Sequence, residues 1–394
     1  MKNFFMSFLM FFFVSGYCQK IPIIGYMGVP EQNISVDNYK VMKDAGFSIS
    51  LMNFSNLNNA INALDTAQKA GIQLILFFPQ LHSEPQINIP KIKNHPALYG
   101  YFIGDEPFPS DFNNFLKYID IIKTYDDSHK FYINLNPMYA PKERFDGVNY
   151  EDYISQAINK LPFSFVSFDH YPLVGNKIRK EFYENLEIIN RQSQKYNKPF
   201  WAFACSTIHF DYLKPELAGL KLQQFGNLVY GAQGLQYFTY WTMTSDPNWI
   251  KDNYSYSIVD DKGQPTSTYN IVKIINEQVQ RLAWVFAGAK SDAVFHTGNN
   301  IPAGTKKLTS LPKHFSSFST KGQDALIAYM SNGAKEFIII QNKSLSQDLN
   351  LTYKLNFSLE KVENKSGKIT TLFSKRKYND IILPGDILIF VREK

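Results

Sequence analysis

The chain has 394 residues and a formal net charge of +6, and its composition is 44% hydrophobic and 19% charged. This charge is too low, and the apolar content too high, for a disordered protein, while the length suggests about two domains. The sequence has no long Lys/Arg run and no basic helix face, so we do not expect a nucleic-acid partner.

The first residues have the pattern of a secretory signal peptide. Lys2 is followed by an apolar run that is too short to span a membrane. We therefore exclude residues 1–18 from the fold, with a cut expected before Gln19, and expect an exported protein, periplasmic or extracellular. The alternative is a lipid anchor on Cys18, although Tyr17 makes a poor lipobox. No later segment predicts a membrane span.

Apolar runs then alternate with helical patterns as far as residue 289. Strands are predicted at 21–26, 47–52, 72–78, 98–103, 131–135, 163–168, 199–204 and 234–241. Helices are predicted at 36–45, 57–70, 112–123, 150–160, 179–196, 215–230 and 266–287. Near-continuous apolar strands are typical of buried parallel sheets, and eight such units in about 270 residues fit a (β/α)8 TIM barrel. The alternative is a doubly wound open sheet, but no Gly-rich phosphate loop follows the first strand.

The pattern changes after Ala289 to short alternating runs bounded by turn residues. Strands are predicted at 325–330, 336–341, 349–355, 368–372, 380–383 and 386–390. This spacing predicts a small all-β sandwich. The expected organisation is therefore an α/β barrel domain over residues 19–289, followed by a β-sandwich domain over residues 290–394.

A pair of carboxylates follows the fourth predicted strand, within the motif Gly104-Asp105-Glu106-Pro107. Burial disfavours a charged carboxylate, so acids at the end of a buried strand need partners or a chemical role. Pro107 cannot donate a hydrogen bond to a sheet, which places both acids in the loop after the strand. In a parallel barrel this loop lies on the catalytic face.

Other predicted strands also end in polar or aromatic residues. These are Asn136 after the fifth strand, Asp169, His170 and Tyr171 after the sixth, Cys205 at the seventh, and Tyr240 and Trp241 at the eighth. A parallel barrel brings these ends to one mouth. Carboxylates transfer protons, amides bind hydroxyls and aromatic rings stack on sugar faces, so the set predicts a carbohydrate ligand.

The barrel with this motif, followed by a sandwich, resembles the clan A glycoside hydrolases, in particular bacterial β-galactosidase-like proteins, over essentially the whole mature chain. The resemblance implies that Glu106 is the general acid/base and that Asp105 takes the place of an Asn that contacts the sugar 2-hydroxyl. One departure is that the seventh strand ends Phe203-Ala-Cys-Ser-Thr207. The clan places a nucleophilic Glu there.

Asp169 is the nearest replacement for the missing carboxylate. A retaining enzyme needs carboxyl groups about 5 Å apart and an inverting one roughly 6.5–9.5 Å. An inverting pair, an unusual nucleophile and a barrel that binds without cutting all remain open. Asn136, His170, Tyr171, Trp201, Tyr240 and Trp241 are the expected sugar contacts. We expect no cofactor and no catalytic metal, because the histidines show no metal-ligand spacing.

The sequence thus predicts a secreted glycoside hydrolase with Glu106 as its acid. The main alternative is an inactive carbohydrate-binding barrel of a glycan-uptake system, which would explain the missing seventh-strand Glu. A weaker alternative is a lyase or esterase that uses His170 or His209, but the sequence contains no nucleophile elbow. Each of these residues also has a purely structural interpretation. Glu106 would then hold its loop, and Asp169 would cap a neighbour. Cys205 would be a small buried apolar residue, and Tyr240 and Trp241 would belong to the core.

Overall fold

The computed structural model describes residues 19–175 and 177–394. The expected signal peptide and Cys18 lie outside this part of the chain. Within it, no helix is long and apolar enough to cross a membrane.

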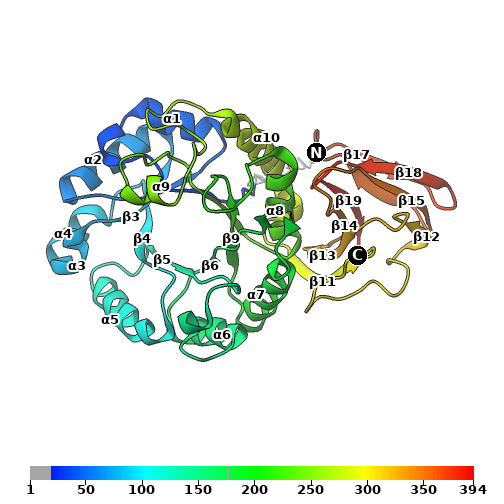
Figure 1. Ribbon diagram of the computed structural model, residues 1–394, viewed down its shortest axis with the longest axis horizontal. Helices are drawn as coiled ribbons and strands as arrows, with labels where there is room; N and C mark the ends of the chain where they lie inside the picture. The colour runs from blue at the N-terminus through cyan, green and yellow to red at the C-terminus, as the bar shows by residue number, and fades with distance from the viewer. Residues whose placement is uncertain (1–18, 176) are drawn as a thin grey trace, which may run out of the picture.

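Eight parallel strands close into a barrel in the order β1-β10-β9-β6-β5-β4-β3-β2 (Figure 1). The strands are β1 (Ile23–Tyr26), β2 (Ile49–Asn53), β3 (Gln73–Phe77), β4 (Leu98–Asp105), β5 (Lys130–Leu135), β6 (Val166–Phe168), β9 (Phe200–Cys205) and β10 (Gly234–Phe238). The predicted TIM barrel is confirmed, and the alternative of a doubly wound open sheet is wrong.

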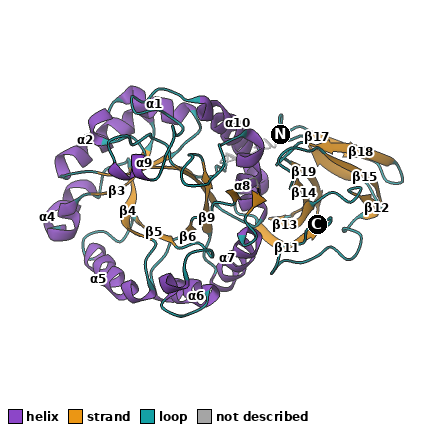
Figure 2. Cartoon of the chain, in the orientation of Figure 1, coloured by secondary structure: helices purple, strands orange, loops and turns teal. Residues whose placement is uncertain are grey.

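Helices surround the barrel on its outer side (Figure 2). The predicted ones form α1 (Val36–Asp44), α2 (Leu57–Ala70), α5 (Phe112–Lys123), α6 (Tyr150–Lys160), α7 (Phe182–Tyr196), α8 (Leu217–Val229) and α10 (Ser267–Arg281). For α2 the boundaries are set locally, because the Asn56 side chain accepts a hydrogen bond from the Asn59 amide and Gly71 ends the helix at a φ of 70°.

Several short elements were not predicted: α3 (Pro79–Ser83), α4 (Pro85–Ile92), α9 (Pro247–Lys251) and the small hairpin of β7 (Leu173–Val174) with β8 (Lys177–Ile178). The helix predicted at 266–287 is divided into α10 and α11 (Ala283–Phe286). The helices α3, α4 and α9 each begin with a proline. Proline suits the first turn of a helix, because the backbone N–H groups there have no partner within the helix and the N–H that proline lacks is not needed. Pro79 thus starts a helix as well as ending a strand.

The C-terminal strands form two antiparallel sheets, β11-β13-β14-β19-β16-β17 and β12-β15-β18. Their bounds are β11 (Lys290–Thr297), β12 (Phe315–Ser319), β13 (Ala325–Asn332), β14 (Lys335–Asn342), β15 (Leu349–Leu355), β16 (Leu359–Val362), β17 (Ile369–Leu372), β18 (Lys377–Ile382) and β19 (Ile387–Glu393). Ile327 and Phe390 of the larger sheet share one core with Leu351 and Tyr353 of the smaller sheet. This packing confirms the predicted sandwich; the sequence prediction missed β11, β12 and β16.

The larger sheet packs its other face against α8 of the barrel, and residues of both parts form one continuous core. Lys221 of α8 pairs with Asp386, the residue just before β19, and both side chains are buried. Gln278 of α10 donates a second hydrogen bond to Asp386, at 3.1 Å. Gly385 approaches α8 so closely that a Cβ would lie 2.1 Å from the Ala218 carbonyl oxygen, which excludes any larger residue there.

We expect Asp386→Ala to lower the free energy of unfolding by about 3–5 kcal/mol, because it leaves the buried Lys221 ammonium without a partner. Urea unfolding followed by tryptophan fluorescence measures this cost. As a control, Lys361→Met should cost less, since its pair with Asp380 at 2.8 Å is more exposed. Equal losses in the two variants would contradict a special role for the Asp386 pair.

Candidate active site

Three carboxylates gather at the carboxyl ends of β4 and β6, the strands on either side of β5. Asp105 is the last residue of β4, Glu106 follows it, and Asp169 directly follows β6. The Asn134 Nδ2 atom of β5 donates to Asp105 Oδ1 at 3.1 Å and to Asp169 Oδ1 at 2.8 Å. Because both contacts go to one nitrogen, the two accepting oxygens are no more than about 6 Å apart.

A buried polar network inside the barrel orients Asn134. The Ser167 hydroxyl on β6 lies 2.9 Å from Asn134 Oδ1 and accepts a hydrogen bond from Gln236 Nε2 at 2.8 Å. The Tyr132 hydroxyl donates to Gln236 Oε1 at 2.6 Å. Ser167 therefore has its one hydrogen available for the Asn134 carbonyl, which turns the Asn134 NH2 group toward the carboxylates.

Asp105 lies on the floor of the open mouth. Its side chain is exposed to solvent, yet the barrel surrounds it on most sides, and the resulting desolvation raises the pKa of its carboxyl. The Tyr26 hydroxyl at the end of β1 donates to Asp105 Oδ2 at 2.9 Å, and together with Asn134 it opposes this shift.

Glu106 is held by a loop from the next βα unit. The Arg144 guanidinium donates to the Glu106 carbonyl, lies 3.8 Å from its carboxylate, and stacks 4.2 Å above the Phe108 ring. The Glu106 backbone has a φ of 45°, a conformation that non-glycine residues adopt only when their surroundings fix it. Desolvation and the Asp105 charge raise the pKa of Glu106, and Arg144 partly opposes this.

Asp169 is the most buried of the three, with 8% of its surface exposed. Burial first, and then the charges of Glu106 and Asp105, raise its pKa well above the usual carboxyl range. The three groups therefore titrate together, and the cluster keeps a proton at a pH where isolated carboxyls have lost theirs.

The opposite side of the mouth is aromatic. Tyr171, after β6, lies 5.5 Å from Phe238 of β10 and 6.4 Å from Phe203 of β9, between ring centroids. Tyr26 lies 5.7 Å from both of these phenylalanines. Of the aromatic residues predicted from the sequence, Tyr171 is the one that the structure brings to this face of the site.

Asn136 and His170 lie outside the cluster. Asn136 is fully buried, and its amide donates to the Pro107 carbonyl at 3.0 Å, so it fixes the loop that carries Glu106. His170 points away from Asp169 toward α7, where its Nδ1 atom lies 2.9 Å from Asn185 Oδ1. Burial lowers the pKa of His170 to about 3, so it is neutral.

The structure does not bring the remaining predicted sugar contacts to the mouth. Trp201 stacks on Phe165 with ring centroids 3.9 Å apart at the amino end of the barrel. This is about 13 Å below Cys205, since each strand residue advances about 3.3 Å. Tyr240 and Trp241 are buried in the outer core, where Tyr240 packs 5.3 Å from Phe47.

Cys205 occupies the inward position at the end of β9, where a carboxylate was missing in the sequence. Its thiol donates to the Thr207 carbonyl at 3.2 Å. Burial raises the pKa of Cys205 to about 12, so the thiol stays neutral and is no substitute for a carboxylate. In the described part of the chain, no group of three or more His, Cys, Asp or Glu side chains is arranged to hold a metal ion.

Sequence reasoning missed Asn134, Tyr26 and Arg144. A signal for Asn134 was present, because it is a polar residue inside the apolar run Phe131-Tyr-Ile-Asn-Leu135, and a buried amide needs partners. Strand alternation also places Asn134 on the same face of the strand as Tyr132, inside the barrel. Arg144 gave no comparable signal, because its role depends on how a long loop folds back.

We expect Asp169→Asn to raise the melting temperature at pH 8 by about 1 °C, equivalent to about 1 kcal/mol for a chain of this length. The raised pKa of Asp169 means that the native state binds a proton more tightly than the unfolded state, so wild-type stability falls as pH rises through that pKa. The gain should shrink toward pH 4. Calorimetry across this range measures it, and the exposed Asp348→Asn is the control; a variant less stable than wild type at pH 8 contradicts the expectation.

Comparison of the sequence with models of known families and with curated proteins finds no match. Among solved structures, a family 39 glycoside hydrolase from the gut symbiont Bacteroides cellulosilyticus has a TM-score of 0.57 and 10% identity, covering 95% of this chain and 81% of that chain.

Two further structures align over a smaller part of the chain. A β-galactosidase from the haloarchaeon Halorubrum lacusprofundi has a TM-score of 0.48 and 11% identity, covering 70% of this chain and 60% of that one. A family 99 endo-α-mannosidase from Bacteroides thetaiotaomicron has a TM-score of 0.43 and 14% identity, covering 64% and 80%. Of these three structures, the family 39 glycoside hydrolase alone has a TM-score above 0.5, so the comparison of folds rests on it. It shows that this chain shares, along nearly its whole length, the barrel-and-sandwich fold of a glycoside hydrolase.

Proposed function

We propose that this protein is a glycoside hydrolase that acts on an oligo- or polysaccharide. The observation that carries the proposal is the cluster of Asp105, Glu106 and Asp169 at the carboxyl end of the barrel, joined through Asn134. Glycosidic cleavage requires a pair of carboxyl groups in different protonation states, since one must donate a proton and the other, ionised, must assist attack. The shared fold with a family 39 glycoside hydrolase supports the same activity.

Glu106 is the proposed general acid. Its side chain is 40% exposed and so can reach a leaving-group oxygen in the mouth, and its raised pKa favours the protonated form that an acid needs. Arg144 fixes the backbone from which it projects. Protonation of the glycosidic oxygen by Glu106 would then let the C–O bond break through an oxocarbenium-like state.

Asp169 is the proposed second carboxylate. In the state of the coupled cluster in which Glu106 holds the proton, Asp169 is ionised and accepts a proton from the attacking water as Glu106 gives up its own. Asn134 holds one Asp169 oxygen at 2.8 Å and so leaves the other available to the mouth. Asp105, hydrogen-bonded to Tyr26 and Asn134, supplies negative charge beside the cationic transition state and an acceptor for a sugar hydroxyl.

Tyr171, Tyr26 and Phe238 are the proposed platform for the sugar ring. These rings pack against one another in one cluster at the carboxyl end of the barrel, and aromatic surface of this kind matches the apolar face of a pyranose. The signal-like first 18 residues support the further proposal that the protein acts on glycans outside the cytoplasm.

We expect Glu106→Gln to lower kcat on the glycan substrate by about 10³-fold while the melting temperature changes little, because Gln keeps the shape but has no proton to donate. Hydrolysis of a panel of plant, algal and host glycans measures the loss. NMR of the product anomers tests Asp169, since inversion is expected from a base that activates water. Wild-type activity should also fall at high pH as Glu106 loses its proton, consistent with its raised pKa.

The matched control is Glu143→Gln, an exposed carboxylate beside Arg144, which should keep wild-type activity. Activity retained in Glu106→Gln would overturn its assignment as the acid. A protein that cleaves no glycan, yet binds one with an affinity unchanged by Glu106→Gln, would instead be a carbohydrate-binding barrel.

A further inference from the structure

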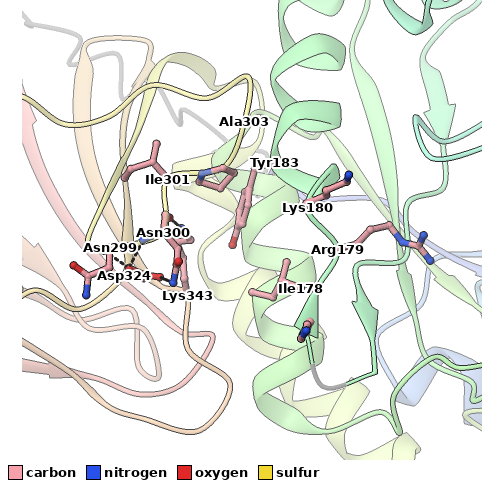
Figure 3. A pocket seen from close by; sticks show the side chains of 12 residues that line it. Ile178, Arg179, Lys180, Tyr183, Asn299, Asn300, Ile301, Ala303, Asp324 and Lys343 are labelled. Atoms are coloured by element: carbon pink, nitrogen blue, oxygen red, sulfur yellow. Dashed lines mark hydrogen bonds between the residues drawn. The ribbon is translucent and has the colours of Figure 1, made fainter.

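A second cavity lies where the barrel meets the sandwich, away from the mouth. It has a volume of about 730 Å³, within the range of small-molecule sites. Its walls come from the segment between β8 and α7 on the barrel side and from the loop after β11 on the sandwich side (Figure 3). The residues closest to the argument are Ile178, Tyr183, Asn300, Ile301, Asp324 and Lys343, and Arg179, Lys180, Asn299 and Pro302 complete the wall.

Lys343, just after β14, places a buried cation at this cavity. It is 7% exposed, and its Nζ atom donates to the Asn300 carbonyl at 3.1 Å and lies 5.2 Å from the centre of the Tyr183 ring. No carboxylate of the described residues forms an ion pair with it within 4 Å. Burial lowers the pKa of Lys343 to about 8, so the amine still carries its proton at neutral pH. Asp324 acts on Lys343 only from beyond ion-pair distance, where its charge partly opposes the effect of burial on the Lys343 pKa. The buried ammonium therefore keeps a desolvation cost that a directly bound anion would lower.

Tyr183 supplies an unused donor at the same place. It is 2% exposed, and its hydroxyl has no hydrogen-bond partner among the described residues. Figure 3 shows this hydroxyl pointing into the space between Ile178 and Lys343. A buried hydroxyl without a partner costs free energy, which a ligand oxygen would recover.

The charges around the cavity favour an anion with a single charge. The Arg179 guanidinium is turned away and lies 3.9 Å above the Tyr139 ring, and Lys180 is exposed beside Glu181. Asp324 is already satisfied by the backbone amides of Asn299 and Asn300, at 2.8 and 3.2 Å. Its negative charge near Lys343 disfavours a dianion such as phosphate.

The remaining wall combines apolar and amide surface. Ile178, Ile301 and Pro302 provide the apolar part, and Asn299 and Asn300 provide the amides. A sugar ring presents this same combination of apolar face and hydroxyl rim. We propose that the cavity binds an acidic sugar, a uronic acid, whose carboxylate accepts hydrogen bonds from Lys343 Nζ and the Tyr183 hydroxyl. The site is separate from the mouth, so the proposal does not depend on hydrolysis there.

Isothermal titration of the full chain with methyl glucuronide and methyl galacturonide tests this proposal, with methyl glucoside and inorganic phosphate as comparison ligands. We expect saturable binding of a uronide that is at least about tenfold tighter than that of the neutral glucoside, because a charge-assisted bond is lost in the latter. Lys343→Met should weaken uronide binding by about tenfold or more, and Tyr183→Phe by a smaller factor.

Two controls locate the effect. Lys180→Met removes a charge from an exposed side chain of the same wall and should leave binding within about twofold. Glu106→Gln alters the mouth alone and should leave uronide binding unchanged, so the failure of one proposal is distinguishable from failure of the other. If Lys343→Met does not fold, as judged by circular dichroism, Tyr183→Phe decides the outcome.

Three results would overturn the proposal. They are no uronide binding at ligand concentrations up to about 10 mM, equal binding of the neutral glucoside, and phosphate binding tighter than uronide binding. Uronide binding that survives both Lys343→Met and Tyr183→Phe would also place the ligand elsewhere on the protein.

Discussion

The burial of three neighbouring carboxylates is the constraint on which the barrel mouth depends. Burial raises the pKa values of Asp105, Glu106 and Asp169, and the charges of neighbouring carboxylates add to this for Glu106 and Asp169. Asn134 offsets part of it by donating to two of the groups with one nitrogen. Its own orientation depends on Ser167, Gln236 and Tyr132, so a polar network deep in the barrel keeps the acidic cluster in place.

The fold could be predicted from the sequence because its signals are local and repeated. Apolar strands, helix periodicity and caps such as Gly71 recur through the barrel, and each is set by nearby residues. Short helices such as α3, and the edge strand β12, were missed because a few residues carry too little pattern to stand out. Packing against the rest of the molecule stabilises these elements.

The site was predicted in part. Gly104-Asp-Glu-Pro107 drew attention to the correct strand end because acids after an apolar run are unusual. Asn136 was predicted to contact the sugar, but the amide that joins the acids is that of Asn134, whereas Asn136 supports the loop after β4 through the Pro107 carbonyl. Trp201 was predicted to contact the sugar, but it lies at the amino end of the barrel. Aromatic content alone does not distinguish a ring that fills the barrel interior from one that stacks on a sugar. Arg144 depends on tertiary structure, which no local pattern reveals.

The order of the strands also places the carboxylates on one half of the mouth and the aromatic rings on the other half. The ionisable groups come from β4 and the strands next to it, β5 and β6, whereas β9, β10 and β1 contribute Phe203, Phe238 and Tyr26. The neutral Cys205 thiol keeps charge out of the aromatic half. A ligand with one apolar face and one hydroxyl-bearing edge can satisfy both halves in a single orientation, so the barrel selects which side of the ligand meets the acids before any bond is broken.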